Sequence, residues 1–154
     1  MAKERAVVKE PKDEIGMNKF ELISTAYNRV KNCKEEGYYL EAITILESLI
    51  GDRMEAILSD TEGEQIGFQT LERLIKIAKR SEVVEEEMKQ MVINELTPWK
   101  DKRNQALHEM VKLQSDNLHD WNSRYDSFKT AIDEGLEIFK QLNKFRQRVI
   151  RANN

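Results

Sequence analysis

Apolar residues recur along the chain at intervals of three and four, the spacing of residues on one face of an α-helix. The first such stretch runs from Asn18 to Gly37 and predicts a helix with Asn18 as its cap and Gly37 as its stop. The stretch from Tyr38 to Ser59 has the broadest apolar stripe and predicts a central helix that contacts several neighbours. No stretch alternates with the period of two that a strand requires.

Four further stretches follow the glycine-containing loop at residues 60–67. They predict a short helix over 68–80, a helix from Ser81 to Leu96, and a helix over 97–112 with Thr97 as its cap and Pro98 in its first turn. Pro98 should break or kink the chain between the last two. The final stretch, from Leu118 to Val149, predicts one helix about 45 Å long. We therefore expect an all-α bundle of about five helices.

Two residues stand out against this pattern. Gly135 lies on the apolar seam of the last helix, where it would permit another helix to approach closely. Arg53 falls near the middle of the central stripe. Either Arg53 pairs with a carboxylate on a neighbouring helix or reaches water, or the stripe passes beneath a polar cleft.

The chain of 154 residues is long enough for one domain. Residues 1–16 alternate charges around Pro11 without an apolar period, which predicts a flexible N-terminal arm. Residues 17–154 then form a single helical domain.

The polar start of the chain lacks the apolar segment of a secretion signal, and no stretch is apolar enough to cross a bilayer. The single Cys33 suits a reducing compartment. We expect a cytoplasmic protein with no membrane contact and a buried or idle Cys33.

The net charge of −3 gives no general attraction to nucleic acid. A local basic segment follows Glu137, and in the sequence its cations face no acidic residue; they are Lys140, Lys144, Arg146, Arg148 and Arg151. Such a segment suits either a charged partner or the carboxyl end of a helix, which favours cations.

Residues able to do chemistry near neutral pH occur together only in the helix over 97–112. Arg103 is a permanent cation, Asn104 carries an amide, and His108 carries an imidazole, a group that can exchange protons near neutral pH. Arg103 and His108 lie about 7.5 Å apart along the axis and about 140° apart around it. Arg103 shares the inward stripe, whereas Asn104 and His108 lie on its flank; the other stripe residues are Trp99, Ala106, Leu107 and Met110.

Two copies of this helix facing one another would bring two Arg103 and two His108 side chains together. One imidazole could then take a proton from a ribose 2′-OH and the other could protonate the leaving 5′-oxygen. The guanidinium groups would hold the phosphate without a metal.

The residues Arg103 to His108, in the pattern R-N-x-x-x-H, resemble the catalytic motif of the HEPN superfamily, whose ribonucleases are all-α. The resemblance implies a homodimer with a composite active site, metal-independent cleavage of RNA, tRNA being one candidate, and 2′,3′-cyclic phosphate and 5′-hydroxyl ends. It implies a toxin or phage-defence effector with an antitoxin or another regulatory partner. Arg103 and His108 would be the catalytic pair, and Asn104 would position them. The residues expected to contact RNA are Lys100, Lys102, Arg146 and Arg148.

One position departs from the family pattern. Family members paired with a nucleotidyltransferase antitoxin often carry a Tyr two residues after the His, where this chain has Met110. Inactivation by adenylylation of that Tyr is therefore not expected.

An alternative needs no catalysis. Arg103 could pair with a carboxylate such as Glu41, Glu47 or Asp52, and His108 could be a surface residue. The chain would then be a helical interaction module that assembles through its long last helix and binds a partner with its basic end, Lys140 to Arg151.

His119, in the turn LHDW at the start of that helix, is interpreted as a capping or solvent residue. Two histidines without a cysteine cluster or a His-Glu-x-x-His segment do not make a zinc site, so we expect neither metal nor cofactor.

Overall fold

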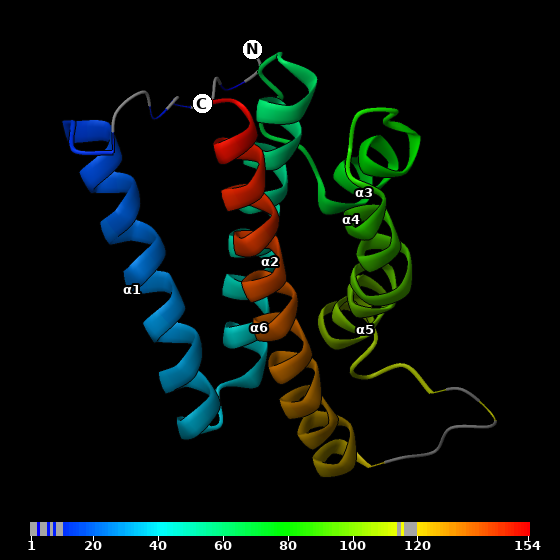
Figure 1. Ribbon diagram of the computed structural model, residues 1–154. Coiled ribbons are helices and arrows are strands. Elements are labelled where there is room, and N and C mark those ends of the chain that lie inside the picture. The colour runs from blue at the N-terminus through cyan, green and yellow to red at the C-terminus, as the bar shows by residue number, and fades with distance from the viewer. Residues whose placement is uncertain (1–2, 4–5, 7, 9–10, 114, 116–119) are drawn as a thin grey trace.

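The computed structural model describes residues 3, 6, 8, 11–113, 115 and 120–154, and these contain helices but no strand (Figure 1). The helices are α1 (Glu14–Glu36), α2 (Tyr39–Glu62), α3 (Leu71–Arg80), α4 (Glu86–Met91), the π-helical segment η1 (Val92–Leu96), α5 (Thr97–His108) and α6 (Trp121–Ala152). Because α4, η1 and α5 follow one another without a break, the described residues form five helical rods. The predicted all-α bundle with a long C-terminal helix is confirmed.

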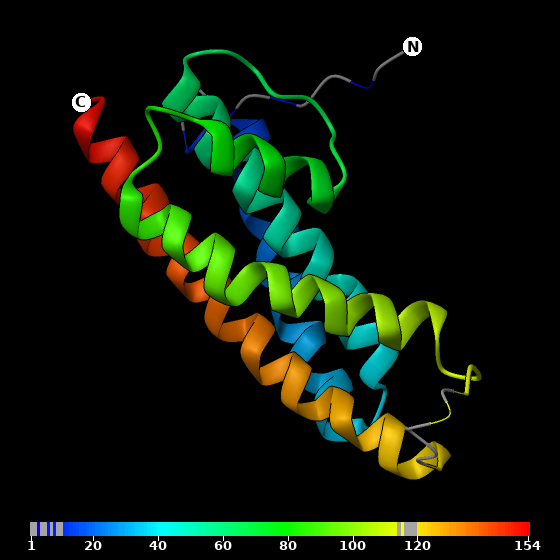
Figure 2. The ribbon, with the colours of Figure 1, turned by 90° about the vertical axis from the view of Figure 1, so that its right-hand side faces the viewer.

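The helix α2 occupies the centre of the bundle. It packs against α1 on one side and along α6 on another, and α3 and α5 complete the bundle (Figure 1). Figure 2 shows α5 lying along α6. Ten of the 24 residues of α2 are buried, which agrees with the broad apolar stripe in the sequence.

The first helix begins earlier than its apolar pattern predicts. The Asp13 side chain accepts a hydrogen bond of 2.6 Å from the backbone amide of Gly16, so Asp13 and not Asn18 is the cap. Residues 14–16 of the expected arm therefore belong to α1, and Gly16 is buried. The predicted stop is confirmed, because Gly37 adopts a φ of +85°, which residues with a side chain rarely adopt.

The connection between α2 and α3 differs from the predicted loop at both ends. The helix α2 continues to Glu62 and ends at Gly63, whose φ is +71°. The helix α3 begins only at Leu71, after Thr70 accepts a 3.3 Å hydrogen bond from a backbone amide of the first turn. Phe68, which the periodicity places in the helix, lies outside it and is exposed.

Ser81 does not open a helix as predicted, because its hydroxyl group is used in the turn itself. It donates to Glu62 of α2 and accepts from the backbone amides of Val83 at 3.3 Å and Val84 at 3.2 Å. These contacts hold the chain in a turn, and α4 begins at Glu86.

Pro98 does not break the helix, and Thr97 is not a cap. Thr97 has helical angles, its backbone N–H bonds to the carbonyl of Val92 five residues earlier, and its hydroxyl donates to the same oxygen at 2.8 Å. A proline ring crowds the preceding turn of an α-helix and supplies no N–H. The wider π-helical turn of η1 accommodates Pro98 and keeps the helix continuous.

The helices α2, α5 and α6 approach one another closely at Gly135. The buried indole of Trp99 donates its Nε1 hydrogen to the carbonyl of Ala131 at 2.7 Å. A Cβ atom on Gly135 would lie 2.8 Å from that Nε1 and 2.9 Å from Cδ1 of Leu46. The close approach predicted from the position of Gly135 is confirmed.

The thiol of Cys33 is buried, as expected, between α1 and the rest of the core. Burial raises its pKa. Both facts make Cys33 a poor nucleophile in the folded protein.

Gly135→Ala should lower the free energy of unfolding by about 1 to 2 kcal/mol, because the clash with Trp99 outweighs the better helix propensity of alanine. Urea unfolding measures this change. Gly51→Ala is the matched control, since Gly51 lies inside α2 and a Cβ atom there would meet nothing within 4 Å. The control should raise the free energy of unfolding by about 0.5 to 1 kcal/mol. A Gly135→Ala variant as stable as the control would contradict this packing.

Candidate functional site

The helix α5 places two of the three motif residues on the wall of a groove. Arg103 and Asn104 line a groove of about 960 Å³ whose other walls come from α1, α2 and the start of α3. The predicted inward stripe is confirmed at Trp99 and Ala106, which are buried. Arg103 and Asn104 are half-buried at its edge.

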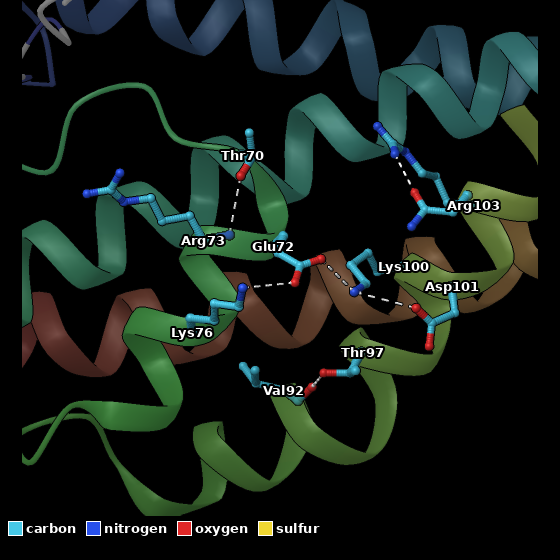
Figure 3. A network of polar contacts seen from close by, with 10 residues as sticks. Thr70, Glu72, Arg73, Lys76, Val92, Thr97, Lys100, Asp101 and Arg103 are labelled. Atoms are coloured by element: carbon cyan, nitrogen blue, oxygen red, sulfur yellow. Dashed lines mark hydrogen bonds and ion pairs between the residues drawn. The ribbon is translucent and has the colours of Figure 1, made fainter. Parts of the chain in front are cut away.

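The guanidinium group of Arg103 is held by two neighbours. Its Nε donates to the Glu47 carboxylate at 2.6 Å, and a terminal nitrogen donates to the same oxygen. The other terminal nitrogen donates to the side-chain oxygen of Asn104 at 2.6 Å. Figure 3 shows the Arg103 side chain extending from α5 toward α2. Of the three carboxylates that the sequence offers as its partner, Glu47 is the one bound.

His108 is the last residue of α5 and is exposed, on the flank predicted for it, and it does not line the groove. The predicted continuation of this helix to Lys112 is wrong. Arg124 of α6 donates from Nη1 to the carbonyls of Glu109, Met110 and Lys112, at 3.4, 3.4 and 2.7 Å. A cation that satisfies these carbonyls stabilises the turn in which α5 ends.

Lys100 and Lys102, both expected to contact RNA, are ion-paired. Lys100 lies 3.0 Å from Glu72, which also binds Lys76 at 3.2 Å (Figure 3). Lys102 binds Glu134 of α6 at 2.7 Å. The pKa of Glu72 is lowered by the hydrogen bonds from Lys100 and, to a smaller extent, from Lys76. This network stabilises the fold above the usual carboxyl pKa, and that contribution disappears as the pH falls through the lowered pKa.

The basic segment at the end of the chain does face acidic residues, contrary to the sequence-based expectation. Arg146 lies 3.8 Å from Asp60 of α2. Arg148 contacts Glu85 at 2.6 Å and Glu87 at 2.7 Å. The sequence pattern missed these pairs because the acidic residues belong to distant segments that only folding brings close.

The groove carries charges of both signs. It is lined by three cations, Lys19, Lys100 and Arg103, and by four carboxylates, Glu47, Asp52, Glu55 and Glu72. Lys19 pairs with Asp52, as Arg103 does with Glu47. A phosphate entering the groove would therefore meet a nearly balanced surface rather than a strongly positive one.

Arg53, unexplained by the sequence, places its guanidinium 5.7 Å from the centre of the Phe139 ring of α6. A guanidinium over an aromatic face is attracted by the ring quadrupole. This contact shows how a cation is accommodated within the apolar stripe of α2.

His119 lies outside the described residues. Among the residues that the structure describes, no group of three or more His, Cys, Asp or Glu side chains is placed to hold a metal ion.

Comparisons with known proteins give no match to a family model, a curated protein or a solved structure. The HEPN resemblance therefore rests on the residues of the motif. Within the described part of the chain, no helix combines the length and the apolar character needed to cross a bilayer.

Lys100→Met should raise the pKa of Glu72 back toward the ordinary carboxyl range, because it removes the larger of the two stabilising contacts. Lys76→Met is the control and should raise it less. The carboxyl carbon resonance of Glu72, followed by NMR between about pH 2 and pH 7, measures both shifts. A larger shift in the control would contradict the order of the two contributions.

Proposed function

We propose that this chain is a metal-independent endoribonuclease that acts as a homodimer. The observation that carries the proposal is the arrangement of the motif on α5. Arg103 and Asn104 are hydrogen-bonded to each other at the groove wall, and His108 lies exposed further along the same helix. The motif thus offers a cation for a phosphate and an accessible imidazole.

The reaction needs only these groups and RNA. A neutral imidazole takes the proton of the ribose 2′-OH, and the 2′-oxygen attacks the adjacent phosphorus. Arg103 stabilises the charge that develops on the phosphate oxygens. The bond between the phosphorus and the 5′-oxygen breaks, and a protonated imidazole donates a proton to that oxygen. The products are a 2′,3′-cyclic phosphate and a 5′-hydroxyl end.

We propose that a second copy of the chain completes this division of roles. His108 is the one histidine in the described residues, whereas the reaction uses one imidazole as base and another as acid. A two-fold contact supplies the second His108, together with a second Arg103.

In the proposed RNA contacts, phosphate groups of the RNA replace carboxylates as the partners of basic side chains. Lys100, Lys102, Arg146 and Arg148 each bind a carboxylate in the free protein. Two of the four pairs, those of Lys102 and Arg148, are exposed on both sides, and such pairs contribute little to stability, so a phosphate can replace the carboxylate there at small cost. The proposal includes the cytoplasmic toxin or phage-defence role, with tRNA among the candidate substrates and an antitoxin or another regulatory partner.

The purified protein should cleave RNA in EDTA, and His108→Ala and Arg103→Ala should each lower the rate by at least about 100-fold. A denaturing gel of digested tRNA measures the cleavage, and end-labelling identifies the cyclic phosphate. Lys140→Ala is the control, because Lys140 is exposed and its only described ion pair is a 4.0 Å contact with Glu137. Equal activity in all four proteins would reject the assignment.

The rate of cleavage should pass through a maximum near neutral pH. One imidazole must be neutral while the other is protonated, so the active fraction falls when the pH is low enough to protonate both or high enough to deprotonate both. Single-turnover rates between about pH 5 and pH 9 give this profile. A rate that does not vary over that range would contradict the use of two imidazoles.

A second candidate function is favoured by a different observation. Apolar side chains are exposed where α5 ends and α6 begins, namely Val111, Leu113 and Trp121. Exposed large apolar side chains suit a contact with another protein. A helical interaction module would assemble in solution and would leave RNA intact, so light scattering combined with the EDTA digest separates it from the nuclease.

A further inference from the structure

The carboxylate of Glu47 is the closest charged neighbour that the structure gives to Arg103. Both of its hydrogen bonds to the guanidinium end on one oxygen, Oε2. The two side chains are only 20% and 23% exposed, so water screens this pair less than it screens a fully exposed ion pair. Glu47 therefore restrains Arg103 in one orientation.

A guanidinium group has five N–H donors. In Arg103, two of these N–H groups donate to Glu47. A third donates to Asn104. Two N–H groups remain for a phosphate oxygen while the side chain stays fixed. The Glu47 carboxylate therefore does not prevent Arg103 from binding a phosphate, because it occupies only some of the N–H groups of the guanidinium.

Glu47 is well placed to restrain a side chain, because it lies on the central helix α2. Its neighbour Leu46 is fully buried in the contact between α2, α5 and α6. An arginine without such a partner samples many rotamers, and fixing it on binding costs free energy. A partner on a rigid helix fixes the arginine side chain already in the free protein, so this free energy is not lost when the substrate binds.

We propose that Glu47 is a positioning residue for Arg103: it fixes the guanidinium for the developing phosphate charge, and its own negative charge weakens the binding of RNA. The inference rests on the proposed ribonuclease function and adds to it a residue from a helix outside the motif. Positioning acts on the reacting phosphate, whereas the charge acts on every nearby phosphate. The two effects therefore have opposite signs.

Glu47→Ala should lower kcat by about 10- to 100-fold, because Arg103 loses its orientation. The same variant should bind uncleaved RNA about two- to fivefold more tightly at low salt, because one like charge is removed. Steady-state cleavage at saturating RNA gives the first quantity. The Kd of an RNA with a 2′-deoxy substitution at the cleavage site gives the second.

Glu47→Gln separates orientation from charge. Glutamine keeps an oxygen that can accept both hydrogen bonds from Arg103 but carries no charge. It should hold kcat within about threefold of the unsubstituted protein and should show the tighter binding of RNA. Glu41→Ala is the matched control, because Glu41 lies on the same helix, does not line the groove and pairs with Arg29 at 3.2 Å. It should change neither quantity.

The outcomes are distinct. An unchanged kcat in Glu47→Ala overturns the positioning role and leaves the nuclease intact. Loss of both rate and affinity in Glu47→Ala and Glu47→Gln alike, with a lower unfolding temperature, means that Glu47 is only structural and also overturns the inference. Absence of cleavage by the unsubstituted protein rejects the proposed function, and the positioning role with it.

Discussion

The contact between the indole of Trp99 and the backbone of α6 sets the geometry of this protein. Trp99 can reach the carbonyl of Ala131 only because Gly135 has no side chain, and Leu46 of α2 fills the remaining space. Three helices are thereby fixed at one point. Since Arg103 lies one turn beyond Trp99 on α5, this packing also determines where the motif stands relative to Glu47 on α2.

The continuity of the helix from α4 to α5 depends on a local adjustment. A proline in the middle of a helix usually ends or bends it, but the π-helical turn at Val92–Leu96 makes room for Pro98. The motif is therefore carried by a long continuous helix that is buried on one face. A site supported in this way can hold Arg103 more precisely than a loop could.

The charged residues form pairs between helices rather than separate acidic and basic surfaces. Arg148 reaches Glu85 and Glu87, and Lys102 reaches Glu134, across long separations in the sequence. Pairs of this kind explain how a chain rich in charge keeps a nearly balanced surface. They also mean that binding of a polyanion would proceed by exchange of partners, which makes such binding sensitive to salt.

The sequence by itself determined the helical class, the central position of α2 and the close approach at Gly135, because these follow from local periodicity and residue size. It also placed Arg103 inward and His108 on the flank. Only the tertiary structure decided that Glu47 holds Arg103 and that Arg124 binds the carbonyls of the turn after α5. Those contacts join residues far apart in the chain, and no local pattern specifies which of many carboxylates or carbonyls a long cationic side chain will reach.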